Sequence, residues 1–152
     1  MFRYAIILAL VATCLCSSKL HAHCEVPCGI YGDDARFSAM AEDAQTIEKA
    51  MSMIADLAGK DDAQSANQLA RWVMTKEEHA NKIQHVVTQY FMTQRLKAPA
   101  GDDTAAFAAY ANKLVLLHKM LRTAMLCKQS VDKTHPQELH DLLHEFKVEY
   151  SK

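Results

Sequence analysis

The chain has 152 residues, which is enough for one domain with a sizeable core, and half of them are apolar. Its 17 basic and 18 acidic residues give a formal net charge of −1. Because there is no basic excess and no stripe of Lys and Arg, a nucleic-acid-binding protein is excluded.

The first 22 residues have the three parts of a secretory signal peptide. Arg3 supplies the positive charge, Tyr4 to Cys16 form an apolar stretch, and Ala22 offers a small residue for cleavage. The apolar stretch is too short to span a bilayer comfortably. We therefore expect residues 1–22 to be removed as a cleaved signal peptide.

Cleavage after Ala22 would leave a single domain, residues 23–152, whose first residue is His23. We expect this domain to be exported, to a periplasm or out of the cell, and to have no membrane attachment. The alternative is a lipoprotein with its lipid on Cys14, which Thr13 disfavours because threonine is a poor residue before such a cut.

The segment after the cleavage site, HCEVPCGIY at residues 23–31, combines two cysteines with a histidine. A proline and a glycine beside the second cysteine let the chain curl tightly, which suits either a disulfide or a metal chelate. Cleavage would free the amine of His23. This amine, the amide nitrogen of Cys24 and the sulfurs of Cys24 and Cys28 could then lie in one plane around a metal. Two nitrogens and two sulfurs in a tetragonal arrangement favour Ni(II) or Cu(II) over Zn(II).

Four later segments have apolar residues at alternating spacings of about three and four, which predicts amphipathic helices. In the second segment, Lys76 stands at a position where the pattern requires an apolar residue. The residues expected to face the core are, in chain order, Met40, Ala44, Ile47, Met51, Ile54, Ala58, Leu69, Val73, Ala80, Ile83, Val87, Tyr90, Phe107, Tyr110, Leu114, Leu117, Leu121, Ala124, Leu139, Leu142, Leu143, Phe146 and Tyr150.

Residues with capping or helix-breaking properties separate these segments. The expected boundaries are, in chain order, Asp33 or Asp34 as the first cap, Gly59 as a stop, residues 98–101 as the end of the second helix, Asp102 or Asp103 as the third cap, and His135-Pro136 before the fourth helix. Each helix is therefore followed by a short connection.

Four amphipathic helices with short connections bury their apolar faces most simply as an antiparallel four-helix bundle. The predicted fold is all-α, with the bundle at about residues 33–152 and a metal-binding hook loop before it. Cys127 lies in a helical stretch and is interpreted as a small buried apolar side chain. The chemistry is therefore expected at the new N-terminus and not in the bundle.

The pattern His23-Cys24-x-x-Pro27-Cys28-Gly29-x-Tyr31 resembles the nickel hook of the nickel-containing superoxide dismutase family. Members of that family also have a four-helix bundle of similar length and assemble as homohexamers. The resemblance implies an enzyme that converts superoxide to O₂ and H₂O₂ by cycling between Ni(II) and Ni(III). It further implies one nickel per subunit and a homohexamer.

The resemblance also implies a role for each matching residue. The amine of His23, the amide nitrogen of Cys24 and the thiolates of Cys24 and Cys28 would hold the nickel, and the His23 imidazole would bind axially in the oxidised state. Tyr31 would stand over the open face of the metal and restrict what reaches it.

The sequence departs from the family pattern behind the hook. A glutamate and an arginine orient the axial imidazole in the family, and the corresponding positions here carry Ser38 and His79. His79 or Glu42 could substitute for them, since a metal-bound histidine needs a partner for its other nitrogen. Tyr90-Phe91 resembles a Tyr-Phe pair of the family after a gap of about one helical turn, so Tyr90 is either a second active-site tyrosine or a core residue.

Two other functions fit the same residues. An exported protein could bind nickel or copper with these donors without turnover. Alternatively, Cys24 and Cys28 could form a structural disulfide in an oxidising compartment.

Overall fold

A computed structural model of the chain describes residues 32–152, and every regular element in this part is helical. The elements are α2 (Asp33–Leu57), α3 (Ala63–His85), η1 (Val86–Arg95), α4 (Thr104–Gln129) and α5 (Thr134–Tyr150). The prediction of an all-α fold is confirmed. The expected hook loop lies outside the described residues.

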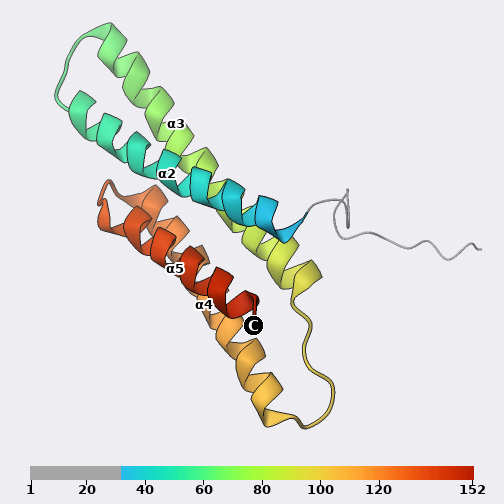
Figure 1. Ribbon diagram of the computed structural model, residues 1–152. Coiled ribbons are helices and arrows are strands. Elements are labelled where there is room, and N and C mark those ends of the chain that lie inside the picture. The colour runs from blue at the N-terminus through green and yellow to red at the C-terminus, as the bar shows by residue number, and fades with distance from the viewer. Residues whose placement is uncertain (1–31) are drawn as a thin grey trace, which may run out of the picture.

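The helices pack as two hairpins laid side by side (Figure 1). The first hairpin is α2 with α3, the second is α4 with α5, and between the hairpins α3 contacts α4 while α2 contacts α5. Consecutive helices run in opposite directions because their connections are short. The helical bundle is therefore as predicted, and none of its described helices is long and apolar enough to cross a membrane.

The expected helix boundaries are confirmed at two places. Gly59 follows the end of α2 with φ at +84°, a conformation that other residues resist, so it reverses the chain toward α3. Asp103 caps α4, because its carboxylate accepts a hydrogen bond of 3.0 Å from the amide of Ala106. Asp62 caps α3 in the same way, through the amide of Ser65 at 2.9 Å.

The expected cap of the first helix is wrong. Gly32 occupies the N-cap position, and Asp33 and Asp34 both lie inside the first turn of α2, where the helix dipole favours negative charge. The expected break at His135-Pro136 is also wrong in detail. Pro136 lies in the first turn of α5, where a helix needs no amide donor from it.

One contiguous apolar core lies between the described helices. It contains most of the residues predicted from the stripes, and Cys127 is fully buried among them as expected. Burial raises the pKa of the Cys127 thiol to about 11, so the thiol stays protonated at neutral pH. Three predicted core positions are wrong, because Ala58 is exposed, Val73 is 40% exposed and Phe107 is 60% exposed.

An aromatic cluster fills the core near the start of α2. The ring of Phe91 lies 5.0 Å from the rings of both Phe37 and Phe146 and 5.5 Å from that of Tyr150, measured between centroids. Two of these contacts are edge-on, the geometry that favours aromatic pairs beyond their area of burial. The cluster joins α2, η1 and α5.

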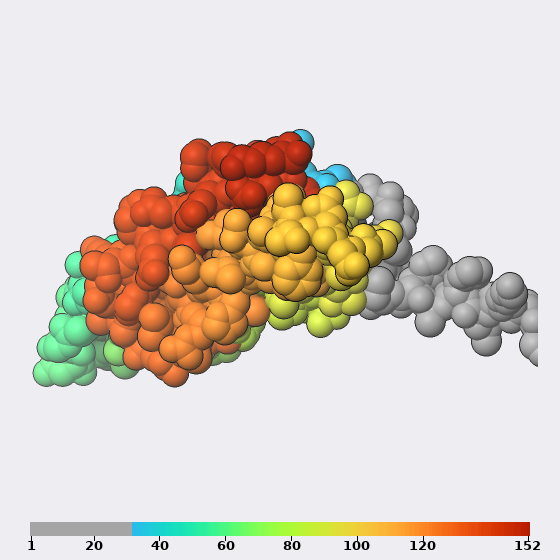
Figure 2. Space-filling model, turned by 90° about the horizontal axis from the view of Figure 1, so that it is seen from below, coloured from blue at the N-terminus to red at the C-terminus, as the bar shows by residue number. Residues whose placement is uncertain are grey.

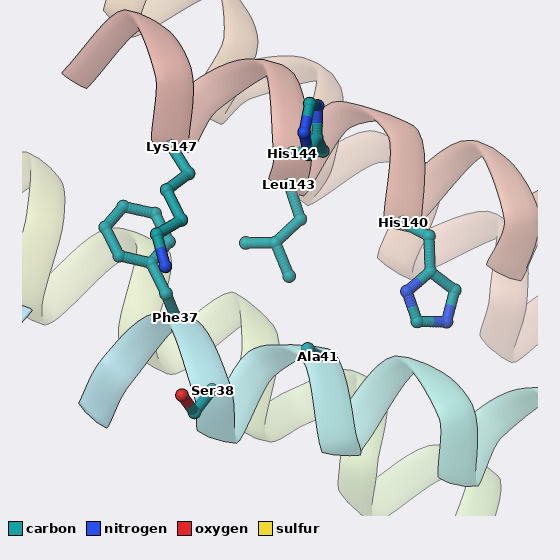
Figure 3. A pocket seen from close by; sticks show the side chains of 7 residues that line it. All are labelled: Phe37, Ser38, Ala41, His140, Leu143, His144 and Lys147. Carbon is teal, nitrogen blue, oxygen red and sulfur yellow. The ribbon is translucent and has the colours of Figure 1, made fainter. Parts of the chain in front are cut away.

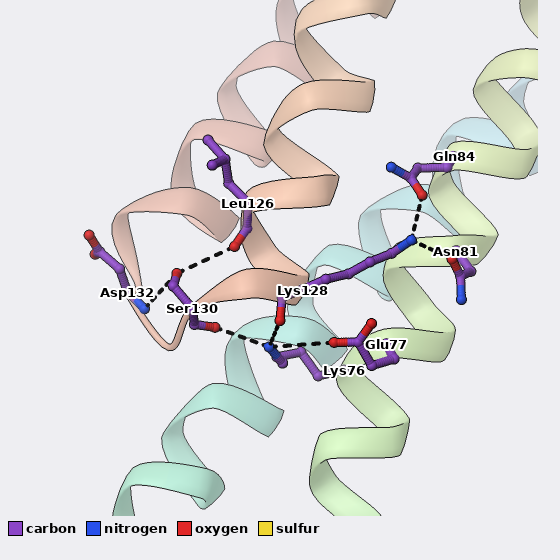
Figure 4. Close-up of polar contacts among 8 residues, drawn as sticks. All are labelled: Lys76, Glu77, Asn81, Gln84, Leu126, Lys128, Ser130 and Asp132. Carbon is purple, nitrogen blue, oxygen red and sulfur yellow. Dashed lines mark hydrogen bonds and ion pairs between the residues drawn. The ribbon is translucent and has the colours of Figure 1, made fainter.

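Lys76, the charge in the second apolar stripe, is only 5% exposed and has its own set of partners (Figure 4). Its ammonium group donates hydrogen bonds to the carbonyl oxygens of Lys128 and Ser130, and Glu77 lies 3.7 Å away. The carbonyls at the end of α4 lack helical partners and carry the negative end of the helix dipole. Lys76 therefore ties α3 to the end of α4, and this explains how a cation is accommodated in the stripe.

Candidate metal centre

The sequence-predicted ligands His23, Cys24 and Cys28, and the predicted gate Tyr31, all lie outside the described residues. Their assignment stays a prediction from the sequence. Within residues 32–152, no three side chains of His, Cys, Asp or Glu gather closely enough to hold a metal ion. The described chain begins at Gly32, directly after the predicted hook, so the structure describes only the surface around the start of α2.

Three parts of the fold meet around Gly32 and the start of α2. Figure 2 shows the blue start of α2 at the surface beside the red end of α5, with the yellow-green end of η1 at the same end of the molecule. Because the helices are antiparallel, the starts of α2 and α4 share this end with the last turns of η1 and α5. The turn between α2 and α3 lies at the opposite end.

A cluster of polar side chains, which we call the Asp33 cluster, connects these parts. The carboxylate of Asp33 accepts hydrogen bonds from the Tyr90 hydroxyl at 2.6 Å, the Arg95 guanidinium at 2.6 Å and the Tyr150 hydroxyl at 2.9 Å. Arg95 also donates to the Tyr150 hydroxyl at 3.2 Å. The first turn of α2 is therefore bound to both η1 and α5 by side-chain contacts with long separations along the chain.

The helix type of η1 explains how Tyr90 and Arg95 both reach Asp33. The sequence predicts one uninterrupted α-helix through Tyr90, but Val86–Arg95 form a π-helix, which ends with the amide of Leu96 bonded to the carbonyl of Phe91 at 2.9 Å. Bonds between residues five apart bring Tyr90 and Arg95 onto one side, whereas residues five apart in an α-helix point to different sides. Both side chains can therefore reach the same carboxylate.

The electrostatics of the cluster keep Tyr90 neutral and Arg95 charged at neutral pH. Partial burial, the hydrogen bond to Asp33 and the charge of that carboxylate raise the pKa of Tyr90 to about 12. The pKa of Arg95 is raised by its hydrogen bonds to Asp33 and Tyr150. Tyr90 is thus a neutral phenol whose proton is directed at Asp33. Sequence reasoning missed Asp33, Arg95 and Tyr150 as a group, because no periodicity indicates a π-helix.

His79, one of the two residues that could orient the imidazole of His23, has a partner inside the bundle. Its Nδ1 lies 2.6 Å from Oδ1 of Asp43, which is buried between α2 and α3. Burial raises the pKa of Asp43, although the hydrogen bond to His79 opposes that shift. The other candidate, Glu42, is exposed on α2. Asp43 lies ten residues after Asp33, or about 15 Å along the helix.

A groove between α2 and α5 adjoins the start of α2 (Figure 3). Its volume is about 280 Å³, and Phe37, Ser38 and Ala41 of α2 face His140, Leu143, His144 and Lys147 of α5 across it. Lys147 extends along the face of the Phe37 ring, with its nitrogen 5.5 Å from the ring centre, and lies 3.4 Å from the carboxylate of Asp34. Lys147 therefore places a positive charge beside the start of α2.

The stability of the fold should depend on pH through Asp33. Partial burial raises the pKa of Asp33, but the hydrogen bonds from Arg95, Tyr90 and Tyr150 outweigh burial, and the net pKa lies below its usual value of 3.8. Because folding lowers this pKa, the ionised carboxylate stabilises the fold at neutral pH, and the contribution is lost as the pH falls below the usual value and through the folded-state pKa.

We therefore expect Asp33→Asn to lower the free energy of unfolding at pH 7 by about 1–2 kcal/mol, the range for hydrogen bonds to a charged group after allowance for partial exposure. The difference between the two proteins should begin to shrink below about pH 4, where the carboxyl of the unfolded wild type takes up a proton, and should vanish below the lower pKa of the folded state. Urea titrations followed by circular dichroism at several pH values measure it. A difference that stayed constant down to acidic pH would show that the charge of Asp33 is not what stabilises the cluster.

Comparison with known proteins adds one finding. A family model described as nickel-containing superoxide dismutase matches residues 18–152, a range that includes the segment HCEVPCGIY and every described helix. No curated protein matches the chain, and no solved structure matches it.

Proposed function

The chain belongs to the nickel-containing superoxide dismutase family, and from this membership we propose that residues 23–31 form its nickel hook once residues 1–22 are removed. The protein is an oxidoreductase that uses nickel to convert superoxide to O₂ and H₂O₂. The observation that carries the proposal is the segment itself, because it unites two thiols, a histidine and a potential new amine within the range that the family matches.

The donor set of the hook fits nickel. The amine of His23, the amide nitrogen of Cys24 and the thiolates of Cys24 and Cys28 would hold the metal, and the His23 imidazole would provide a further donor. Two nitrogen and two sulfur donors are typical of a tetragonal Ni(II) site. When bound, nickel supplies one-electron chemistry between Ni(II) and Ni(III), and the anionic donors stabilise the higher state. Because these ligands must lose protons to bind, nickel affinity should rise with pH.

The remaining residue of the hook, Tyr31, would control access to the metal. Its hydroxyl can hold ordered water and restrict the opening to a molecule as small as superoxide. Tyr90 donates its hydroxyl proton to Asp33 at 2.6 Å, two residues after Tyr31, and it stays either a second active-site tyrosine or a core residue. His79 and Glu42 stay candidates for orienting the imidazole of His23.

We further propose that the mature chain is exported and forms a homo-oligomer, the hexamer implied by the family resemblance. The signal-like features of residues 1–22 support export to a periplasm or out of the cell. Large apolar side chains on the bundle surface support assembly. Phe107 and Val115, which are both exposed, lie two helical turns apart on one side of α4, as residues of a contact surface would.

Intact-mass and metal analysis of the purified protein test the hook. We expect a chain that starts at His23, one nickel per chain, and dismutation that depends on the nickel. A variant with one alanine inserted before His23 is the matched control, because it has the same thiols but a displaced amine, and it should be inactive. Full activity in that variant, or in the chain that starts at Met1, would contradict the proposal. Nickel binding at His23 without any dismutation would favour the metal-binding alternative.

A further inference from the structure

We propose that the Asp33 cluster is an anchor that determines where the nickel hook leaves the bundle, so that Asp33, Tyr90, Arg95 and Tyr150 are positioning residues for the nickel centre. This inference rests on the proposed hook. It assigns a role to four side chains that are not metal ligands and that come from three different helices.

Asp33 does not cap its own helix. An aspartate at the start of a helix ordinarily caps the helix by accepting from its free amides, as Asp62 and Asp103 do in this protein. The start of α2 has no side-chain cap. The carboxylate of Asp33 is instead bonded to residues 57, 62 and 117 positions away in the sequence. Its contacts therefore hold the start of α2 against the bundle and do not serve the helix alone.

The first turn of α2 is held from two directions. The Asp33 cluster binds it to η1 and to the last turn of α5, where Tyr150 packs edge-on against Phe37 and Phe91. In addition, Lys147, one turn earlier on α5, lies 3.4 Å from Asp34 and over the ring of Phe37 (Figure 3). A helix start with contacts on several neighbours has little freedom to tilt or unwind.

Only a short stretch of chain separates the anchor from the predicted ligands. Asp33 is two residues after Tyr31 and five after Cys28. Five residues reach at most about 18 Å even when fully extended, so the position of Asp33 limits where Cys28 can lie. If the first turn of α2 frayed, the effective tether would lengthen and the hook would lose its fixed relation to the bundle. A geometry that must be held closely for metal binding would then be populated less often.

Nickel retention tests the anchor without relying on activity. The nickel-loaded mature protein is mixed with excess EDTA and the release of nickel is followed with time, in parallel with thermal unfolding. We expect Asp33→Asn, which keeps the shape of the side chain, to release nickel about 10-fold faster than the wild type, the low end of the effect of residues that orient metal ligands. Arg95→Gln added to Asp33→Asn should cause little further change, since both changes break the same contact.

The matched control is Asp62→Ala, which removes the capping carboxylate at the start of α3, near the opposite end of α2, and should cause a similar loss of stability. It should release nickel at the wild-type rate. The anchor is refuted if Asp33→Asn retains nickel as the wild type does, or if Asp62→Ala releases it equally fast. If a Cys24→Ser protein also retained nickel like the wild type, the hook would be wrong, and the anchor would fall with it.

Discussion

Replacing Cys24 or Cys28 with serine should abolish nickel binding and dismutation while the bundle stays folded. A serine hydroxyl does not ionise at neutral pH and so cannot replace a thiolate donor. We expect the loss of nickel affinity to exceed about 100-fold, the upper end of what changes to outer partners of a metal ligand cause. The core of the described bundle extends from Phe37 to Phe146 and contains neither cysteine, so helicity should be unchanged. Metal analysis, a superoxide assay and circular dichroism measure the three quantities.

Cys127 provides the control for these cysteine variants. It is fully buried in the bundle and its thiol stays protonated, so Cys127→Ala should retain nickel and activity despite some loss of core packing. The opposite pattern would favour a structural disulfide. In that case Cys24→Ser would lower the thermal stability, the wild-type protein would lack free thiols at these two positions, and nickel would be irrelevant to both results.

Phe91→Ala should lower the free energy of unfolding by about 3–5 kcal/mol, a larger loss than we expect for Asp33→Asn. Phe91 is fully buried, and its ring contacts the rings of Phe37, Tyr90, Phe146 and Tyr150 at centroid distances of 5.0, 5.1, 5.0 and 5.5 Å. Truncation would leave a cavity that these rigid rings cannot fill without moving. Because Tyr90 and Tyr150 also belong to the Asp33 cluster, nickel release should accelerate as well. Urea unfolding followed by circular dichroism measures the main effect.

Phe107→Ala is the matched control, since the same substitution is made at a side chain that is 60% exposed. For the isolated bundle its effect should stay within about 0.5 kcal/mol. Both variants should be compared at equal and varied protein concentration, because assembly with other copies would make apparent stability depend on concentration. Equal losses for Phe91 and Phe107 at every concentration would contradict the described packing.

The helical fold could be predicted because each helix has its own local pattern. Residues such as Met40, Ile47 and Leu117 recur at helical spacing, and each is fully buried. The errors occur where burial depends on neighbours. Phe107 has the right spacing but lies on the part of α4 where no described helix covers it, and Asp33 looks like a cap but accepts hydrogen bonds from distant helices instead.

The hook stays a prediction from nine consecutive residues, and it can be made because metal chemistry depends on donor types and their spacing, which are both local properties of the chain. The Asp33 cluster, which follows these residues, could not be predicted. It requires a π-helical winding that aligns Tyr90 with Arg95, and the approach of Tyr150 from 117 residues away. Such contacts come from the packing of helices against one another, and no short stretch of residues encodes them.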